Sequence, residues 1–533
     1  MMIERFDVAA ASLLCLICAP FIGPSAHADT ASSDADFRFG SLFSELGEQE
    51  IADGTLLDVG LSSYDKDNPA YMEDSQFRGT DNNSRIPVGH TYVGQLLTHD
   101  MSQDKDTKLD RQFTPSAIKN HSTPWIDLDI IYNYAGQPAE KDPADPAKLL
   151  LGNDIGNERD FARDAKGRAL ISDQRNDQNN NIAQLTAVVM QFHNAQVDRL
   201  RQEATTDDNE ALFDQARDLT IAHWQAIALT EFLPMFVEED LIDDIIKNGP
   251  KVYTDDMANA GMVPVEFSAA AFRFGHSIVR GRYTLNDNEG SDRVRLFPLS
   301  PKELERSLIG HRAIPKERQI DWDRFFDFET SIQGDLDDDE DQFRGLQVSR
   351  KIDRFLARPM LRIPEFLMLG RPVPERLLKE QLIPDRDVLS LASLNLQRGK
   401  ALRLPSGQAV AARMGEKPLS NEDMGLCADM QSCSEWGYKW QDGSNEAPLF
   451  LYILEESRLQ GGGEKLGAVG GRIVAEVMIG LMRADPGSIM NKNFVSPLTG
   501  TSNYTMADMI YHAGWHQARP GSLTQASSSE NES

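Results

Sequence analysis

Two short segments place a histidine beside side chains that could assist proton transfer or metal binding. The first, GQLLTHD (94–100), puts Gln95 and His99 four residues apart, so on a helix they share one face. An imidazole, with a reference pKa near ~6.5, can take up and return a proton near neutral pH. The second, AFRFGH (271–276), sets His276 in an aromatic, apolar context. The alternatives are a solvated helix end for the first and a satisfied core histidine for the second.

A third segment, TPWIDLD (123–129), carries alternating oxygen ligands. In an extended conformation Thr123, Asp127 and Asp129 fall on one side, with the Trp125 carbonyl between them, and Asp100 could add another oxygen. Carboxylate, hydroxyl and carbonyl oxygens are the ligands that Ca²⁺ prefers. A calcium site and an ordinary surface turn both fit this pattern.

The elements that would position these residues are helical. An apolar stripe at intervals of three and four predicts one long helix, and it comprises Ile182, Leu185, Val189, Phe192, Gln196 or Val197, and Leu200. A second helix is expected from Asn209 to Leu233, ended by Pro234, and a third, buried one over 474–481. Alternation with a period of two is scarce. The sequence therefore predicts a mainly α fold, a single large helical domain with little β structure.

The composition limits the classes of partner that this chain is expected to bind. The 533 residues include 54 Lys and Arg against 83 Asp and Glu, a net charge of −29. Such an acidic chain is not typical of proteins that bind nucleic acid or anionic membranes, which need clustered Lys and Arg. Beyond the N-terminus no stretch approaches the ~18 apolar residues of a membrane span.

The two ends of the chain are expected to lie outside the helical domain. Residues 1–28 predict a signal peptide, with an apolar run over 8–22 and an Ala-His-Ala cleavage pattern at 26–28, and hence a secreted or periplasmic protein. A hydrophobic helix of the folded domain is the alternative. Residues 29–85 are expected to form an extended arm and 519–533 a disordered tail. In an oxidising compartment, Cys427 and Cys433 are expected to pair.

Taken together and in order, the motifs resemble those of the animal-type haem peroxidases of the peroxidase–cyclooxygenase superfamily, in particular the secreted bacterial branch. The resemblance runs from Pro87 to Gly514. It implies a haem peroxidase domain over 86–518. It rests on GQLLTHD (94–100), TPWIDLD (123–129), Arg175 ahead of His193-Asn194, HWQAIALTEFLP (223–234), AFRFGH (271–276), LNLQRG (394–399) and GAVGGRIVAEVMIGLMRADP (467–486).

The resemblance implies a role for each matching residue. His99 would be the distal base, Arg175 the distal arginine that stabilises developing negative charge, and Gln95 the distal glutamine. His276 would be the proximal iron ligand, and Asn395 would accept a hydrogen bond from its other ring nitrogen. Arg273 and Arg398 would pair with the haem propionates. The implied calcium ligands are Asp100, Thr123, the carbonyl of Trp125, Asp127 and Asp129.

Departures from the family pattern limit the cofactor chemistry. The carboxylates that form ester links to haem in mammalian relatives are replaced by Thr98 and Gln178, and the sulfonium-forming methionine by Asn179. The resemblance therefore implies noncovalently held haem b. After QRGK (397–400) the chain also lacks the family's usual Asp-His-Gly run.

The predicted function is reduction of hydrogen peroxide with oxidation of a small electron donor. One alternative is a fatty-acid dioxygenase of the same superfamily, which would carry a tyrosine where this chain has Arg273. Another is a secreted, Ca²⁺-stabilised binding protein without turnover. A phosphate loop at Gly467–Gly471 is disfavoured because no convincing strand precedes it and no Walker lysine follows.

Overall fold

The computed structural model describes residues 36–51, 56, 83–109, 111–152, 159–204, 206–288, 290, 293–298, 301–328, 345–361, 363–364, 388–427, 438–439 and 446–517. The predicted signal peptide, most of the predicted arm, Cys433 and the predicted C-terminal tail lie outside these ranges. The expected Cys427–Cys433 disulfide therefore stays a prediction.

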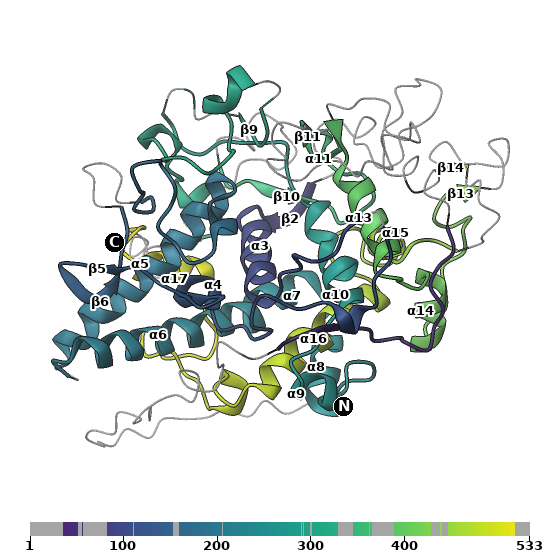
Figure 1. Ribbon diagram of the computed structural model, residues 1–533, viewed down its shortest axis with the longest axis horizontal. Coiled ribbons are helices and arrows are strands. Elements are labelled where there is room, and N and C mark those ends of the chain that lie inside the picture. The colour runs from purple at the N-terminus through teal and green to yellow at the C-terminus, as the bar shows by residue number, and fades with distance from the viewer. Residues whose placement is uncertain are drawn as a thin grey trace, which may run out of the picture.

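Helices dominate the described residues and are arranged around α3 (Figure 1). The α-helices are α3 (Gly89–Met101), α4 (Asp129–Tyr132), α5 (Asn180–Gln202), α6 (Asn209–Ala226), α7 (Leu233–Phe236), α8 (Glu239–Asn248), α9 (Asp255–Asn259), α10 (Val265–Ala269), α11 (Arg358–Leu361), α13 (Leu391–Ala401), α14 (Gly407–Met414), α15 (Leu449–Gln460), α16 (Ala468–Ala484) and α17 (Met506–His512). The 3₁₀ turns are η2 (Pro115–Ala117), η3 (Gln174–Asp177), η5 (Ala271–His276), η6 (Pro301–Arg306), η7 (Lys316–Arg318), η8 (Trp322–Arg324) and η11 (Ile489–Asn491), and η4 (Ile227–Phe232) is a π-helix.

Strands occur only as short two-stranded pairs among the described residues, which confirms the mainly α prediction. The parallel pairs are β1 (Phe39–Gly40) with β7 (Val263–Pro264) and β13 (Leu426–Cys427) with β14 (Tyr438–Lys439). The antiparallel pairs are β2 (Asn83–Pro87) with β10 (Val348–Arg350), β3 (Asn133–Tyr134) with β4 (Gln137–Pro138), β5 (Lys141–Asp142) with β6 (Asp145–Leu149), β8 (Arg282–Tyr283) with β9 (Val294–Arg295), and β11 (Ile363–Pro364) with β12 (Val388–Leu389).

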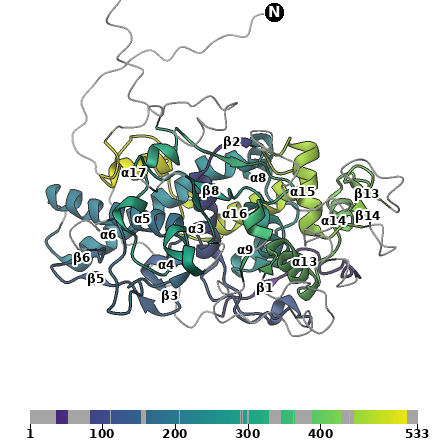
Figure 2. The same cartoon turned by 90° about the horizontal axis from the view of Figure 1, so that it is seen from above.

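Helix α3 lies near the middle of the molecule in both ribbon views (Figures 1 and 2). It packs against α5 and against the short elements η3, η4 and η5. Nearly all of its residues are buried. The exceptions, Gly94, Gln95 and Thr98, are half-buried and share one face of the helix. That face is therefore partly accessible to solvent.

The first predicted long helix is confirmed as α5. Its N-terminus is capped by Asn179, whose side-chain oxygen accepts hydrogen bonds from the backbone N–H groups of Asn181 (3.1 Å) and Ile182 (3.0 Å). The predicted apolar stripe is buried along its length and packs on α3 and α6.

The second predicted helix begins at Asn209 as expected, but Pro234 does not end it. The α-helical part stops at Ala226, continues as the π-helix η4, and resumes as α7 with Pro234 in its first turn. A proline inside an α-helix removes the hydrogen bond to the fourth preceding residue. Here Pro234 occupies the first turn of a new α-helical segment, where the wider π turn has already interrupted the regular bonding, so the chain remains helical to Phe236.

The third predicted helix is confirmed and is longer than predicted, running over Ala468–Ala484 as α16, with Glu476 fully buried. Its N-terminus is occupied by the protein itself. The Glu456 carboxylate accepts hydrogen bonds from the backbone N–H groups of Val469 and Gly470, each at 3.0 Å. A Cβ at Gly467 would lie 2.2 Å from Cγ of Glu456, so this glycine permits close packing. An internal carboxylate thus occupies the position that a bound phosphate would need.

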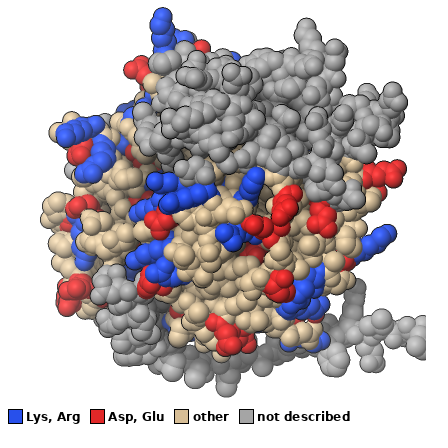
Figure 3. All heavy atoms as spheres, turned by 45° about the vertical axis from the view of Figure 1, so that its right-hand side comes forward, with Lys and Arg blue, Asp and Glu red and all other residues tan. Residues whose placement is uncertain are grey.

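The surface of the described residues carries both signs of charge. On the face drawn in Figure 3, Lys and Arg side chains are interspersed with Asp and Glu. No helix among the described residues is both long enough and apolar enough to cross a bilayer.

Candidate functional site

His99 lies in the last turn of α3 and is buried. Its Nδ1 is 2.9 Å from the side-chain oxygen Oδ1 of Asn176, in η3. Burial, followed by the positive charge of Arg175, lowers the pKa of His99 to about 4. The ring is therefore neutral near pH 7, and Nδ1 donates its hydrogen to Asn176. The Nε2 atom makes no hydrogen bond with any described residue.

Arg175 lies beside His99, with its guanidinium against the C-terminal end of α3. Nη2 donates to the carbonyl of His99 (2.7 Å) and Nη1 to the carbonyl of Ser102 (2.8 Å). Nε donates to the buried carboxylate of Asp173 at 2.8 Å. The guanidinium also lies over the ring of Tyr134, 5.4 Å from its centroid. Its positive charge is therefore fixed in place next to His99.

Gln95 is one helical turn before His99, on the half-buried face of α3. Its side-chain oxygen accepts a hydrogen bond from Nδ2 of Asn179 at 3.3 Å. Gln178, the neighbour of Asn179, is also half-buried. The distal residues named by the sequence are thus brought together at the junction of α3 and η3.

His276 ends the 3₁₀ turn η5, which packs against α3. Burial, and then the charge of Arg273, lower the pKa of His276 to about 3, so this ring is also neutral near pH 7. The side chain is half-buried in a segment that is otherwise mostly buried. A Cβ built on the preceding Gly275 would meet no atom within 4 Å, so open space lies directly beside the histidine.

Asn395, on α13, pairs with His276 as expected. Its side-chain nitrogen Nδ2 lies 2.8 Å from Nδ1 of His276. The direction of this contact differs from the expectation, in which the amide oxygen accepts. A neutral imidazole that binds a metal through Nε2 carries its proton on Nδ1. Iron ligation by His276 therefore requires the Asn395 amide to turn about its Cβ–Cγ bond and present its oxygen.

The two candidate propionate partners lie on different elements. Arg273 precedes His276 by three residues and donates from Nε to the carbonyl of Ser268 at 2.9 Å. Its charge contributes to the lowered pKa of both His99 and His276. Arg398, on α13, forms an ion pair with Asp104 at 2.9 Å. Both arginines are half-buried.

These features are compatible with a flat, iron-containing macrocycle. Gly94, Gln95 and Thr98 on α3 are half-buried, and so are Arg273, Gly275 and His276 on η5. His276 supplies a neutral ring nitrogen, and its Nε2 makes no hydrogen bond with any described residue. Thr98, which donates to the carbonyl of Gly94 at 2.9 Å, and Gln178 carry no carboxylate that could be esterified to such a group.

Three carboxylates lie close together next to His99. One oxygen from each of Asp100, Asp127 and Asp129 lies within 4.8 Å of the others. Burial and the neighbouring Asp127 raise the pKa of both Asp100 and Asp129 well above the usual range. One oxygen of each of these two residues is buried without a hydrogen-bond partner among the described residues. Repelling, unsatisfied carboxylate oxygens fit a hard cation such as Ca²⁺.

The cluster is built by a loop, not by the extended segment that the sequence predicts. Leu128 has a left-handed backbone (φ 57°), and Asp129 begins α4. Thr123 donates from Oγ1 to Asp127 (2.8 Å) and from its backbone N–H to Asp129 (2.9 Å). Trp125 lies in the same loop, with its ring against Phe37 at 6.1 Å. The left-handed turn folds residues 123–129 back on themselves and brings the side chains together.

Helix α6 connects the loop to α3. The indole Nε1 of Trp224 donates to Asp100 (3.2 Å), and Nε2 of Gln225 donates to the carbonyl of Ile126 (2.9 Å). The Trp-Gln pair of the HWQ motif thus fixes both halves of the carboxylate cluster.

Residues 85–321 match the family model described as animal haem peroxidase. This part of the chain is therefore similar to the animal haem peroxidase domain. It holds His99, Arg175, His276 and the carboxylate cluster, whereas Asn395 and Arg398 lie beyond it.

Curated relatives of the peroxidase domain agree with this assignment. The chain is 27% identical over 200 residues to a peroxidase of Drosophila melanogaster, covering 34% of this chain and 29% of that protein. It is 30% identical over 125 residues to the chorion peroxidase of the same species, covering 22% of this chain and 15% of that protein. The chain thus spans less than a third of the length of either relative.

Two solved structures share the fold of most of the chain. Peroxidase A from Dictyostelium discoideum has a TM-score of 0.58 at 16% identity, covering 93% of this chain and 97% of that one. A fatty acid alpha-dioxygenase from Oryza sativa has a TM-score of 0.52 at 14% identity, covering 90% and 79%. These neighbours show that the chain shares their helical fold, and the resemblance to the peroxidase–cyclooxygenase superfamily rests on the motifs and on the family match to residues 85–321. Assignment to its secreted bacterial branch stays a prediction.

Sequence reasoning missed two residues of the candidate site, Asn176 and Asp173. Both flank Arg175, and both are buried. Their signal in the sequence was only their closeness to Arg175, since Asn and Asp are ordinary residues of helix caps and turns.

Proposed function

We propose that this protein is a haem-dependent peroxidase that reduces hydrogen peroxide and oxidises a small electron donor. The observation that supports this most directly is the pair of neutral histidines, His99 on α3 and His276 on η5. Each has Nδ1 next to an asparagine side chain and Nε2 without a hydrogen bond to any described residue. A distal base needs this arrangement, and a metal ligand needs it with the Asn395 amide turned so that its oxygen faces Nδ1 of His276.

On the distal side, His99 acts as the general base. Its bare Nε2 accepts a proton from hydrogen peroxide and returns it to the departing oxygen. Arg175 keeps a positive charge beside this position without moving, because Asp173 and two carbonyls of α3 hold its guanidinium. Gln95, on the same face, orients peroxide or water through its amide.

On the proximal side, His276 binds iron through Nε2, and Asn395 accepts a hydrogen bond from Nδ1 after its amide turns. The amide is neutral, so it leaves the ring less basic than a carboxylate partner would. The haem supplies the two-electron reduction of peroxide. It is held noncovalently, because Thr98 and Gln178 offer no carboxylate, and Arg273 and Arg398 pair with its propionates.

Ca²⁺ occupies the carboxylate cluster in this proposal. Asp100, Asp127 and Asp129 supply charged oxygens, with Thr123 and the carbonyl of Trp125 completing the set. Because Asp100 follows His99 directly, the cation fixes the end of α3 that carries the distal base. The domain extends past the matched family segment to about residue 518, since α13 carries Asn395 and α16 packs against η5. Residues 1–28 direct secretion or export to the periplasm.

Absorption spectroscopy of the full chain supplied with haem tests the proposal. A Soret band that shifts when peroxide is added, with turnover of a phenolic donor, is the expected result. His276→Ala should lose tightly bound haem. His99→Ala should keep haem yet react with peroxide roughly 10²- to 10⁴-fold more slowly, the range for loss of a general base.

His193→Gln is the matched control, because His193 is also buried but both of its ring nitrogens are hydrogen-bonded, to Tyr132 and Ala147. It should keep both properties. Normal peroxide reactivity in His99→Ala would contradict the assigned base. Haem binding without turnover of any donor would favour the alternative of a Ca²⁺-stabilised binding protein. Extraction of the haem into acidified acetone tests whether the haem is held noncovalently.

Fatty-acid oxygenation is not favoured, although dioxygenases share the fold. The residue three positions before His276 is Arg273, whose guanidinium cannot serve as the radical that a tyrosine provides at this position.

A further inference from the structure

We propose that Asn176 is a positioning residue that fixes the ring orientation and the tautomer of His99. The inference rests on the proposed function, because it assigns the means by which the distal base presents a bare Nε2. It concerns which nitrogen carries the proton of the neutral ring.

The contact between the two side chains is short and sealed from solvent. Asn176 is fully buried, and its Oδ1 lies 2.9 Å from Nδ1 of His99. An amide oxygen can only accept, so it selects the tautomer with hydrogen on Nδ1. The lone pair of Nε2 then points away from η3. Because His99 makes no other side-chain hydrogen bond with a described residue, Asn176 alone determines this choice.

The amide could act in the opposite sense only if it were turned over. Its Nδ2 is buried and without a hydrogen-bond partner among the described residues. A turned amide would donate from Nδ2 to Nδ1, and the proton of His99 would then sit on Nε2. A base in that form could not take a proton from peroxide. The two orientations therefore predict opposite tautomers.

The residues on both sides of Asn176 in the chain fix the position of its side-chain amide. Its backbone N–H donates to the carbonyl of Asp173 at 3.1 Å, closing the 3₁₀ turn. On one side of Asn176, Arg175 ties η3 to the carbonyls of His99 and Ser102. On the other side, Asp177 is bound by Arg163.

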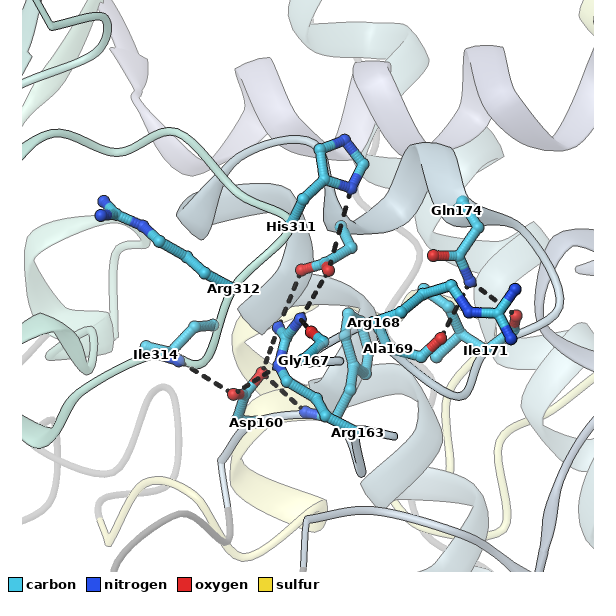
Figure 4. Close-up of polar contacts among 12 residues, drawn as sticks. Asp160, Arg163, Gly167, Arg168, Ala169, Ile171, Gln174, His311, Arg312 and Ile314 are labelled. Atoms are coloured by element: carbon cyan, nitrogen blue, oxygen red, sulfur yellow. Dashed lines mark hydrogen bonds and ion pairs between the residues drawn. The ribbon is translucent and has the colours of Figure 1, made fainter. Parts of the chain in front are cut away.

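Arg163 forms two hydrogen bonds to the Asp177 carboxylate, of 2.6 and 2.9 Å, and two to Asp160, of 2.9 and 3.1 Å. Figure 4 shows Arg163 beside Asp160, with the segment of His311 and Ile314 packed next to them. The backbone of His311 donates to the carbonyl of Asp177 at 2.7 Å, which fastens η3 to this segment. Asn176 is thus placed by a buried ion cluster on one side and by α3 on the other.

Nitrogen NMR of histidine tests the proposal. The full chain is labelled with ¹⁵N-histidine, and any bound haem is held in the diamagnetic ferrous carbonyl form. His99→Gln identifies the signals of His99. At pH 7 the wild-type ring should show hydrogen on Nδ1. Asn176→Asp keeps an acceptor oxygen in the same place and should keep this pattern, whereas Asn176→Leu, of similar size, should lose it.

Asn180→Ala is the matched control, since Asn180 is also buried and lies four residues further on, but its Nδ2 donates to the carbonyl of Arg318 (3.1 Å). It should leave the His99 signals unchanged. A wild-type ring protonated on Nε2, or the same tautomer in wild type and Asn176→Leu, would overturn the proposal.

Kinetics separate this inference from the proposed function. Asn176→Leu should lower the second-order rate with peroxide roughly 10- to 100-fold, as loss of an orienting partner does, with the KM for the donor unchanged. Asn176→Asp should restore most of that rate. If the wild type shows no peroxidase turnover, the proposed function fails, while the NMR pattern still decides whether Asn176 sets the tautomer.

Discussion

Replacing Arg163 by methionine should loosen the η3 turn that carries Arg175 and Asn176. The Arg163 side chain is only 8% exposed, and those of Asp160 and Asp177 are 1% exposed each. Methionine fills similar space but leaves two buried carboxylates without their counter-charge. Breaking a buried ion pair from one side costs about 3–5 kcal/mol, because the remaining charge is uncompensated.

That cost should be measurable as faster hydrogen exchange in residues 173–182, which open together when η3 detaches. Since about 1.4 kcal/mol is a tenfold change, exchange through local opening should accelerate by roughly 10²- to 4 × 10³-fold. Hydrogen-exchange mass spectrometry on the full chain reports this segment directly. The amides of Asn176 and Gln178 donate to carbonyls of Asp173 and Arg175, and that of Asn180 donates to the carbonyl of Leu308. These three amides should show the largest acceleration relative to wild type.

Arg168→Met is the matched control from the same turn (Figure 4). Arg168 pairs with Asp164 at 3.3 Å but is 69% exposed, so its loss should leave exchange unchanged. The triple variant R163M/D160N/D177N removes the unpaired charges and should recover most of the protection. Equal acceleration in Arg163→Met and Arg168→Met, or less than about a threefold change in Arg163→Met, would refute this account of the ion cluster.

Two further predictions follow from buried carboxylates. Burial raises the pKa of Glu456 to about 7, above its ordinary value of 4.5. Its contribution to stability is therefore complete below pH 4.5 and is lost as the pH rises through 7, by up to about 3 kcal/mol. Glu456→Gln should remove this pH dependence from urea midpoints between pH 5 and 8, and an unchanged slope would contradict it. Ca²⁺ should raise the thermal midpoint of chelator-treated protein, by the equivalent of about 2.7 kcal/mol at 100 times Kd. Asp129→Asn should weaken that response, and a midpoint independent of Ca²⁺ would exclude the proposed site.

The sequence determined those parts of the site that depend on local spacing. Gln95 and His99 share a face because they are four residues apart on a helix, and α3 has that helical form. The apolar stripe of α5 and the buried α16 likewise follow from a period near 3.6. The meeting of Asp100 with Asp127 and Asp129 was anticipated from ligand chemistry, although the loop that achieves it was not.

Other features could not be read from local pattern, because the partners are far apart in the chain. Glu456 occupies the N-terminus of α16, and Trp224 and Gln225 fix the carboxylate cluster from α6. The passage of the helix through Pro234 required the π-helical turn η4. Each depends on hydrogen bonds or packing that only the assembled helices provide.

Asn176 shows most clearly what the sequence and the tertiary structure each determine. The sequence places an asparagine beside Arg175, but asparagine is common in turns of many kinds. Only the folded molecule points its oxygen at His99, because Arg163 reaches from a separate turn to hold Asp177, and Arg175 is bonded to the end of α3. Residue spacing along a helix is dictated by covalent geometry, which the sequence carries, whereas the direction of one amide is dictated by charges that meet only after folding.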